Sequence, residues 1–350
     1  MDIIDERPTP GEQPPRRKRH TARNVLLGFL AVFLVAALVV GAYVFNLAST
    51  VNGETKKLDA AFPTAAGRPS KVVAPGSQAE NILVLGSDSR AAAVTQDATA
   101  SDQRSDTMMW VHIPGDRKGI SVMSIMRDTW VTIPGHGENK INAALAFGGI
   151  PLVVQTLEGL FNNRIDHVLE VDFQGFSELT DALGGVEINV PIPFDSYHMP
   201  GKHYSAGPQL MDGKTALAFV RERYAFNDGD YQRVRDQQIY LKALLANLTS
   251  AGTLSNPLKI AEAVKRFSPY VSVDKSLNAA SMAGLALELR NVRAGDVVTF
   301  TLPTKGTGWS PDGQQSIVLR DDAAIQGIGK AMTDGQLLSY LSVSGLDKGN

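Results

Sequence analysis

The chain has 350 residues, 43% of them hydrophobic and 20% charged, which is enough to bury a substantial core. Its formal net charge of −2 provides no overall basic field, so the composition does not indicate nucleic-acid binding. The absence of cysteine excludes disulfides, thiol catalysis and thiolate metal sites. Of the six histidines, only His198 and His203 lie close together, and without cysteine partners we interpret them as ordinary loop residues.

The N-terminal end of the sequence predicts a single membrane anchor. Residues 25–45 carry no charge, and 21 such residues form a helix that can cross a hydrocarbon core of roughly 30 Å. We therefore place a transmembrane helix at 24–47, after a disordered tail at 1–23. The basic run RRKRHTAR ends that tail, so we predict a single-pass protein of the cell membrane, with a cytoplasmic N-terminus and an extracytoplasmic body. A cleaved signal peptide is the alternative, but its apolar region would span only ~7–15 residues.

The rest of the chain predicts a linker and one large domain. Residues 48–80 combine a short helical pattern with a Pro/Gly/Ser-containing connector, and residues 81–345 have a uniform texture without repeats. Short β-branched runs predict strands at 81–86, 107–113, 119–125, 130–134, 167–172, 185–190 and 296–303. Apolar periodicity predicts helices at 142–147, 152–161, 173–183, 213–223, 231–249, 256–267 and 277–289. This mixture predicts an α/β fold, a three-layer α/β/α sandwich around a mixed central sheet.

Charged side chains stand beside the first three predicted strands. Asp88 and Arg90 follow the first strand, Asp106 precedes the second, and Arg127 and Asp128 follow the third. Ligands in α/β folds gather at strand carboxyl ends, so these positions are candidates for a site. Structural roles are also open to them, such as an Asx-turn at Asp88. Adjacent residues of an extended chain point to opposite faces, so Arg127 and Asp128 share a cleft only if the strand has ended.

A second charged cluster surrounds the start of the helix predicted at 231–249. Asp230 occupies the expected N-cap position. Arg233 and Gln237 lie four residues apart on one helix face. Arg233 falls in the first turn, where the helix dipole disfavours a cation and free N–H groups attract an anion. A cation that helix stability does not favour indicates a ligand.

Arginines gathered with carboxylates are typical of a site for phosphates and a divalent cation. A guanidinium binds phosphate oxygens bidentately, at roughly 1.5–3 kcal/mol for each charge-assisted bond. Several arginines in one pocket repel each other without an anion, and carboxylates near that anion need a hard cation such as Mg²⁺ between them. The two clusters therefore predict a diphosphate–metal site for phosphoryl transfer. The sequence contains neither a P-loop nor a G-x-S-x-G hydrolase motif.

The motifs resemble the LytR-CpsA-Psr family in order and spacing, over about residues 81–335. They are NILVLGSDSR, RSDTMM, SIMRDTWVTIPG, KINAALAFGG, VDFQGFSELTDALGGVEINVP, GPQLMDGKTALAFVRERY and GDYQRVRDQQ. The resemblance implies a membrane-anchored phosphotransferase that moves a glycopolymer from a polyprenyl-diphosphate lipid to peptidoglycan. It implies Mg²⁺ (or Mn²⁺) as cofactor, and the lipid-linked glycan, peptidoglycan and the membrane as partners, with no nucleic acid.

The resemblance also implies roles for single residues. Asp88 and Asp106 match the aspartates near the metal, and Gln237 matches a polar position beside the diphosphate. The arginines that match those around the diphosphate are Arg90, Arg127, Arg221, Arg223 and Arg233.

Two positions depart from the family pattern. Met126 stands where proline is frequent, and Asp236 stands where arginine is frequent, with Arg235 as a candidate substitute. We count Arg127, Asp128 and Asp230 as catalytic candidates. Arg127 stays protonated and is no simple base, so a carboxylate must take that role, and the sequence does not identify which.

Two other functions remain open at the level of the sequence. The chain could be a non-catalytic polyprenyl-phosphate binder in a wall-assembly or regulatory complex. It could also be a lipid-diphosphate phosphatase, with water as the acceptor. The combination of carboxylates and arginines favours chemistry over binding alone. The run IPLVVQTLEGLF at 150–161 is a candidate wall for the prenyl chain, or ordinary core.

Overall fold

The computed structural model describes residues 20–64, 67–71, 78–87 and 105–348, without side chains at 20–36, 105 and 106. The chain divides into two units, Met1–Leu47 and Ala48–Asn350. We call the second unit the body. The asymmetry in size is large, and the body contains all the described strands.

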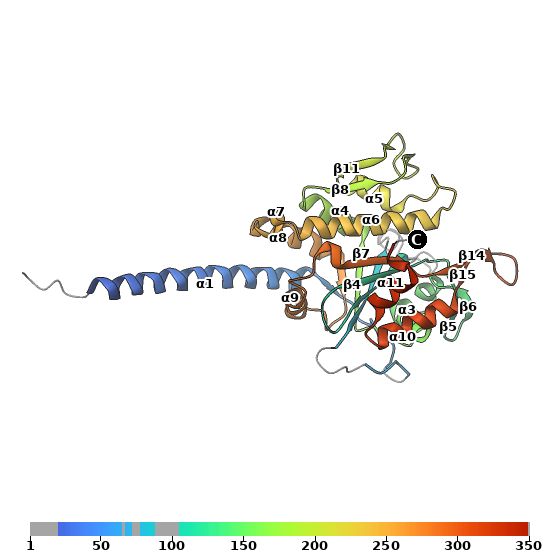
Figure 1. Ribbon diagram of the computed structural model, residues 1–350, viewed down its shortest axis with the longest axis horizontal. Coiled ribbons are helices and arrows are strands. Elements are labelled where there is room, and N and C mark those ends of the chain that lie inside the picture. Colours follow the sequence, from blue (N-terminus) through green and yellow to red (C-terminus); the bar gives the residue numbers. More distant parts are fainter. Residues whose placement is uncertain (1–19, 65–66, 72–77, 88–104, 349–350) are drawn as a thin grey trace, which may run out of the picture. The chain divides into compact units, whose positions relative to one another are not determined.

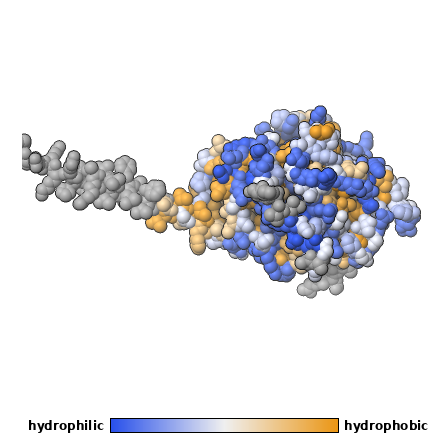
Figure 2. Space-filling view, turned by 60° about the horizontal axis from the view of Figure 1, so that its bottom comes forward, coloured by the Kyte–Doolittle hydropathy of each residue, from blue (hydrophilic) through white to orange (hydrophobic). Residues whose placement is uncertain are grey.

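The helix α1 (His20–Glu54) is continuous through the apolar run at 25–45. Several of its described large apolar side chains are exposed, with 73% exposure at Leu38 and 76% at Phe45. In the space-filling view the described part of α1 is mostly hydrophobic, whereas the visible surface of the body is mostly hydrophilic or mixed (Figure 2). A helix therefore covers the predicted segment, and its crossing of a membrane stays a prediction.

In the described part of the body, seven strands form a mixed sheet in the order β1-β12-β7-β2-β3-β4-β13. Their bounds are β1 Lys56–Lys57, β2 Glu80–Ser87, β3 Ser105–Ile113, β4 Ile120–Ile125, β7 His167–Asp172, β12 Val271–Val273 and β13 Val297–Thr301. β2 runs parallel to β7 and antiparallel to β3, and β4 is antiparallel to β3 and parallel to β13. The carboxyl ends of β2, β4, β7 and β13 therefore meet at one edge, which we call the carboxyl edge. This confirms the predicted mixed central sheet.

The sheet is covered on both faces, because alternate residues along its central strands are apolar on each side. Leu83, Trp110 and Met123 belong to the core on one face, which also contains residues of α3, α10 and α11. Val84 and Met109 belong to the opposite face, which packs against α6. Figure 1 shows α6 and α10 on opposite sides of the sheet. The helices of the body are α3 Ala143–Phe161, α4 Phe173–Ala182, α5 Gly213–Arg221, α6 Asp230–Leu248, α7 Ala251–Leu254, α8 Pro257–Phe267, α9 Ala279–Glu288, α10 Asp322–Thr333 and α11 Leu337–Ser344.

In the described part of the body, four further antiparallel strand pairs lie outside the seven-stranded sheet. They are β5 (Trp130–Ile133) with β6 (Gly137–Lys140), β8 (Val186–Val190) with β11 (Gly207–Met211), β9 (Phe194–Asp195) with β10 (His203–Tyr204), and β14 (Thr304–Trp309) with β15 (Ser316–Arg320). The β8–β11 and β9–β10 pairs share a second hydrophobic core with α4, α5 and α6. This core fixes α5 and α6 above the carboxyl edge.

The helix α3 spans two predicted helices, 142–147 and 152–161. Gly148 and Gly149 have non-helical backbone angles, and Pro151 follows them, so the chain kinks between the two parts. Gly149 has φ 66°, which favours glycine. Among the described residues, α3 is the helix that is long and apolar enough to cross a membrane, and half of that stretch is buried. Its buried residues belong to the core beneath the sheet, so α3 is a core helix.

The helix α6 buries polar side chains on the side facing the carboxyl edge. Gln238 donates through Nε2 to Ser124 Oγ and Thr301 Oγ1, both at 3.1 Å, which fastens the helix to the ends of β4 and β13. Asp236 is 1% exposed and accepts a hydrogen bond of 2.8 Å from Gln232 Nε2. Burial raises the pKa of Asp236 to about 7, although the Gln232 hydrogen bond opposes that rise. The carboxyl group is therefore held largely as the neutral acid at mildly acidic pH.

Asp236 should make the body less stable as the pH rises from about 4 to 7. In that window the folded state keeps a proton that the unfolded chain, with an aspartate pKa of about 3.9, releases. Asp236→Asn keeps the acceptor for Gln232 and cannot ionise. We expect the Asn variant to unfold at a higher temperature than the wild-type chain at pH 8 and at nearly the same temperature at pH 4.5. Tryptophan fluorescence of the full chain in detergent measures this, and a pH-independent difference would contradict the assignment.

Candidate functional site

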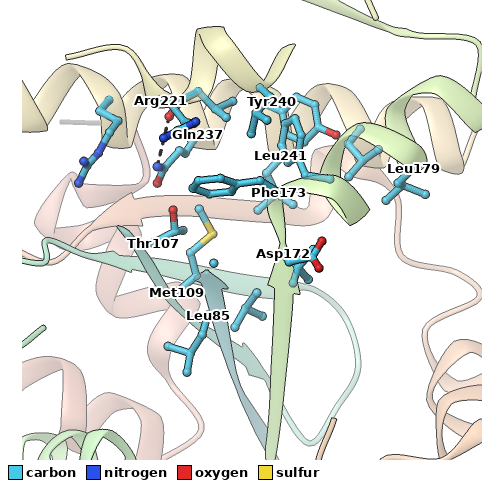
Figure 3. A pocket seen from close by; sticks show the side chains of 18 of the residues that line it. Leu85, Thr107, Met109, Asp172, Phe173, Leu179, Arg221, Gln237, Tyr240 and Leu241 are labelled. Carbon is cyan, nitrogen blue, oxygen red and sulfur yellow. Dashed lines mark hydrogen bonds between the residues drawn. The ribbon is translucent and has the colours of Figure 1, made fainter. Parts of the chain in front are cut away.

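A cavity of about 460 Å³ lies between the carboxyl edge of the sheet and helices α4, α5 and α6. Most of its wall is apolar, and the apolar residues come from β2, β3, β7 and these helices, with Phe267 at the end of α8. They are Val84, Leu85, Met109, Leu169, Val171, Phe173, Phe176, Leu179, Leu217, Val220, Tyr240, Leu241, Leu244 and Phe267. Figure 3 shows Arg221, Gln237 and Thr107 toward one end and Leu179 toward the other. The cavity therefore has a polar end and a long apolar remainder.

The polar end brings together four arginines that the sequence analysis selected. Arg127 lies in the turn after β4, Arg221 ends α5, Arg223 follows in the next bend, and Arg233 lies in the first turn of α6. Gln237, one helical turn beyond Arg233, also lines the cavity and donates to Val220 O at 3.3 Å. Of the described residues that line the cavity, four are arginines and one, Asp172, is a carboxylate. The polar end is therefore electropositive.

Protein groups orient these arginines. Arg233 Nη2 donates to Asp230 Oδ2 at 3.0 Å, and Arg223 Nη1 lies 3.9 Å from Asp230 Oδ1. The guanidinium carbon of Arg221 lies 4.3 Å from the ring centre of Phe173, the first residue of α4. The electron-rich face of an aromatic ring attracts a cation, so the Phe173 ring can hold the Arg221 guanidinium group without a carboxylate. Asp230 and Phe173 thus fix three of the four guanidinium groups.

Asp230 differs from the role expected for it. The N-cap of α6 is Gly229, with φ 44°, and Asp230 is the first residue of the helix. Its side chain turns to the arginines instead of capping backbone N–H groups, because two guanidinium groups offer stronger charge-assisted bonds. The buried Oδ1 atom has no hydrogen-bond partner within the described residues.

The turn after β4 carries Arg127 and Asp128, whose side chains stay in contact, with Arg127 Nε 4.0 Å from Asp128 Oδ2. The strand ends at Ile125, and Thr129 N closes the turn on Met126 O at 3.0 Å. Of the Arg-Asp pair, Arg127 is among the described cavity-lining residues and Asp128 is not. The other carboxylate oxygen of Asp128 lies 3.3 Å from Lys140 Nζ. Met126, the first departure from the family pattern, is buried in a small apolar cluster.

Arg235 does not take the place of the arginine that the family pattern has at 236. It forms an ion pair with Asp228 and donates through Nε to Gln232 Oε1 at 3.0 Å. It is not among the described residues that line the cavity. Asp236 is buried and is likewise not among the described residues that line the cavity, so neither residue supplies a cation there.

Some predicted residues fall where the structure gives no side chain. Asp88 and Arg90 lie outside the described residues, and Asp106 is in β3 without a described side chain. The register pairs Thr107 with Gly86, and both line the cavity. Asp106 therefore directly precedes a cavity residue in the sequence. Within the described residues, no group of three or more His, Asp or Glu side chains could hold a metal ion.

The structure adds cavity residues that sequence reasoning missed. Asp172 ends β7 and caps α4 by accepting from Gly175 N at 2.7 Å. Its position after an apolar strand repeats the pattern of Asp88, so a signal was present. His198, interpreted as a loop residue, also lines the cavity, and burial and then Arg221 lower its pKa. By contrast, the apolar run 150–161 belongs to α3 and the core and supplies no residue of the described wall.

Comparison with known proteins places the chain in a family. The LytR_cpsA_psr family model matches residues 43–330. Probable cell wall biosynthesis protein LcpB of Corynebacterium glutamicum is 34% identical over 79% of this chain, which spans 64% of LcpB. Polyisoprenyl-teichoic acid–peptidoglycan teichoic acid transferase TagU of Enterococcus faecalis is 30% identical over 83% of this chain and 89% of its own length. The chain thus spans less than two thirds of LcpB but most of TagU.

Solved structures agree with the fold. TagV of B. subtilis shares 24% identity with a TM-score of 0.62, covering 74% of this chain and 98% of TagV. A structure of TagT bound to LI-WTA shares 24% identity with a TM-score of 0.60, covering 79% of this chain and 98% of TagT. The family match covers more than half of the chain, and the structures share its mixed central sheet. The chain is a member of the LytR_cpsA_psr family.

Proposed function

We propose that the chain is a membrane-anchored phosphotransferase that moves a glycopolymer from a polyprenyl-diphosphate carrier onto peptidoglycan. The observation that carries this proposal is the two-part cavity, apolar along most of its wall and lined by arginines at one end. A prenyl diphosphate matches this cavity, because it has a long apolar chain and a negatively charged diphosphate at one end. The name of TagU, a teichoic acid transferase acting on a polyisoprenyl-linked donor and peptidoglycan, supports the assignment.

The arginine end suits a diphosphate. Guanidinium groups bind phosphate oxygens bidentately, and they stabilise the charge that develops during phosphoryl transfer. Arg127, Arg221, Arg223 and Arg233 reach the cavity from separate segments, so they can surround one ligand. Gln237 adds an amide beside them, and Arg90 is proposed as a further member. The prenyl chain then occupies the apolar wall between α4 and α6.

The transfer needs a group that accepts a proton. A sugar hydroxyl of peptidoglycan attacks the glycan-side phosphorus, the bond to the bridging oxygen breaks, and polyprenyl phosphate leaves. Asp230 is better placed than Asp128 to accept the hydroxyl proton. Its carboxylate contacts two of the cavity arginines, and its Oδ1 has no hydrogen bond among the described residues. Asp128 contacts one cavity arginine, Arg127, at 4.0 Å, and its other oxygen pairs with Lys140.

The family resemblance implies Mg²⁺ or Mn²⁺, and the chain offers suitable oxygen donors. Asp88 follows Gly86 by two residues, a distance of at most ~7 Å along the chain, and Asp106 directly precedes Thr107. Gly86, Thr107 and Asp172 line the cavity. Mg²⁺ in phosphate-transfer sites typically takes one or two carboxylates together with substrate phosphates. We propose that Asp88 and Asp106 hold the ion, which when bound offsets charge on the phosphates.

The anchor places the body at the membrane. The exposed apolar side chains of α1 match a helix in contact with lipid, and the basic run before it puts the N-terminus in the cytoplasm. The donor lipid is rooted in the same bilayer, so tethering raises the effective concentration of encounter. The body then faces the cell wall.

Reconstitution separates this function from its two alternatives. The full chain in detergent is incubated with Mg²⁺, a lipid-linked oligosaccharide and peptidoglycan fragments. A product joined to peptidoglycan through a phosphodiester is the expected result. Release of the oligosaccharide phosphate without any joined product would identify a lipid-diphosphate phosphatase. Saturable binding without turnover would identify a non-catalytic binder.

Arg127→Lys and Arg233→Lys should each lower kcat by about 10²–10³-fold. Lysine keeps the charge but does not reproduce the planar two-pronged donor. The matched control is Arg235→Lys on the same helix, because Arg235 pairs with Asp228 away from the cavity. Steady-state kinetics with the lipid-linked donor measure the three variants. Near-normal rates for both cavity variants would show that these arginines do not clamp the diphosphate.

Asp88→Asn and Asp106→Asn should lower metal-dependent transfer by orders of magnitude, because Asn keeps the shape and loses the charge. Binding of Mn²⁺, followed by electron paramagnetic resonance, should weaken in parallel. Asp116→Asn serves as the control, since its carboxylate is exposed and pairs with Lys118. Full activity of the wild-type chain in EDTA would rule out the metal.

Protease treatment of intact protoplasts tests the topology. Cleavage of the body from outside is expected, with the segment 1–23 protected. Deletion of residues 1–47 should leave transfer on short-chain lipid analogues and impair complementation in cells, since the tether is lost. A protected body together with cleavage near Arg16 would contradict both the topology and the cell-wall role.

A further inference from the structure

A group of aromatic side chains lies on the surface beside the arginine end of the cavity. Tyr197 and His198 come from the loop between β9 and β10, and Tyr224 comes from the bend after α5. The ring centres of Tyr197 and Tyr224 are 4.5 Å apart, and that of His198 is 5.6 Å from Tyr197 and 6.1 Å from Tyr224. Tyr197 is 65% exposed and Tyr224 is 57% exposed. We call these three residues the aromatic platform.

A buried carboxylate holds both halves of the platform in place. Glu222 is 0% exposed and accepts hydrogen bonds from the Tyr197 and Tyr224 backbone N–H groups, at 2.7 and 3.0 Å. It also accepts from Ser196 Oγ at 3.2 Å and Arg223 N at 3.0 Å. Burying a carboxylate is costly unless several donors surround it, and here those donors come from two distant segments. The arrangement fixes exposed rings that contribute little to the core.

The platform is continuous with the arginine end. Arg223 Nη2 donates to the Tyr224 hydroxyl at 2.5 Å, and its guanidinium carbon lies 4.5 Å from the ring centre. His198 and Tyr224 line the cavity together with Arg221 and Arg223. A group covalently bonded to a phosphate at Arg223 would therefore lie against these rings.

Exposed, preorganised tyrosine rings next to an anion site match one ligand chemistry well. A pyranose ring has an apolar face of C–H bonds, which packs on the electron-rich face of an aromatic ring, and hydroxyl groups at its edge, which bond to tyrosine OH and water. Rings held in place before binding lose little conformational freedom when the ligand arrives. A lipid tail would instead favour the apolar wall of the cavity, and a second anion would favour more cations.

We propose that Tyr197, His198 and Tyr224 form a pyranose-binding subsite outside the diphosphate site. The sugar is either the residue bonded to the glycan-side phosphate of the donor or a residue of the peptidoglycan acceptor. This inference rests on the proposed function, because it takes the arginine end as the phosphate site. Glu222 acts as a positioning residue for the platform.

Titration of the full chain in detergent tests the subsite. The donor probes are a short-chain prenyl diphosphate and the same diphosphate bonded to one N-acetylglucosamine; the acceptor probe is a soluble N-acetylglucosamine–N-acetylmuramic acid disaccharide. The variants are Tyr197→Ala, Tyr197→Ala with Tyr224→Ala, and the corresponding double Phe variant, which keeps both ring faces. Trp309→Ala is the control, because Trp309 is 68% exposed on β14 and does not line the cavity in the described residues.

In the wild-type chain and the Trp309→Ala control, the sugar should strengthen diphosphate binding by on the order of tenfold. The double Ala variant should lose this gain, and the double Phe variant should keep most of it. Tyr197→Ala, whose ring does not line the cavity among the described residues, should reduce the gain and leave binding of the bare diphosphate unchanged. Loss of disaccharide binding with an intact donor gain also supports the subsite and assigns it to the acceptor. If neither sugar probe responds to the Ala variants, the subsite is wrong. Failure of the bare diphosphate to bind the wild-type chain would instead refute the proposed function, and the disaccharide arm would still test the platform.

Discussion

Repulsion among arginines at the end of an apolar cavity is the constraint on which the site depends. Arg127, Arg221, Arg223 and Arg233 line one cavity, and like charges in a partly desolvated space destabilise each other unless an anion or a carboxylate lies between them. Asp230 offsets part of this charge by contacting two of them, and the Phe173 ring supports a third. The proposal of an anionic ligand rests on this excess of arginines over carboxylates among the described residues that line the cavity.

The scaffold keeps those cations together by fixing α6. Gln238 donates to hydroxyls at the ends of β4 and β13, which ties the helix that carries Arg233 and Gln237 to the sheet. The β8–β11 pair packs with α4, α5 and α6 into a separate core and holds α5 alongside. The cavity therefore lies between this separate core and the apolar residues on the α6-facing side of the sheet, such as Val84 and Met109. The polar end and the apolar wall arise from the same packing.

Strong periodicity made the central strands and α4 to α6 predictable, and arginines among apolar segments made the cavity cations predictable. Two helices of the body, α10 and α11, were not predicted, because their sequences lack a clear helical pattern. The α10 sequence contains two glycines, and α11 is short and rich in serine, so neither pattern indicated a helix. No neighbouring residue marks His198 as part of the site, because the contact arises from a loop that folds over α5. Asp230 and Arg235 each have several oppositely charged neighbours within a few residues, and the spacing does not show which of them pair in the fold.

The central claim is that the cavity arginines and the apolar wall bind two parts of the same ligand. Calorimetric titration of the full chain with a short-chain prenyl diphosphate, the matching prenyl alcohol and inorganic diphosphate measures this most directly. The account predicts that the prenyl diphosphate binds far more tightly than either fragment and that only the two phosphate-containing ligands weaken in Arg233→Lys. Equal affinity for the alcohol and the diphosphate, or no effect of that substitution, would contradict it.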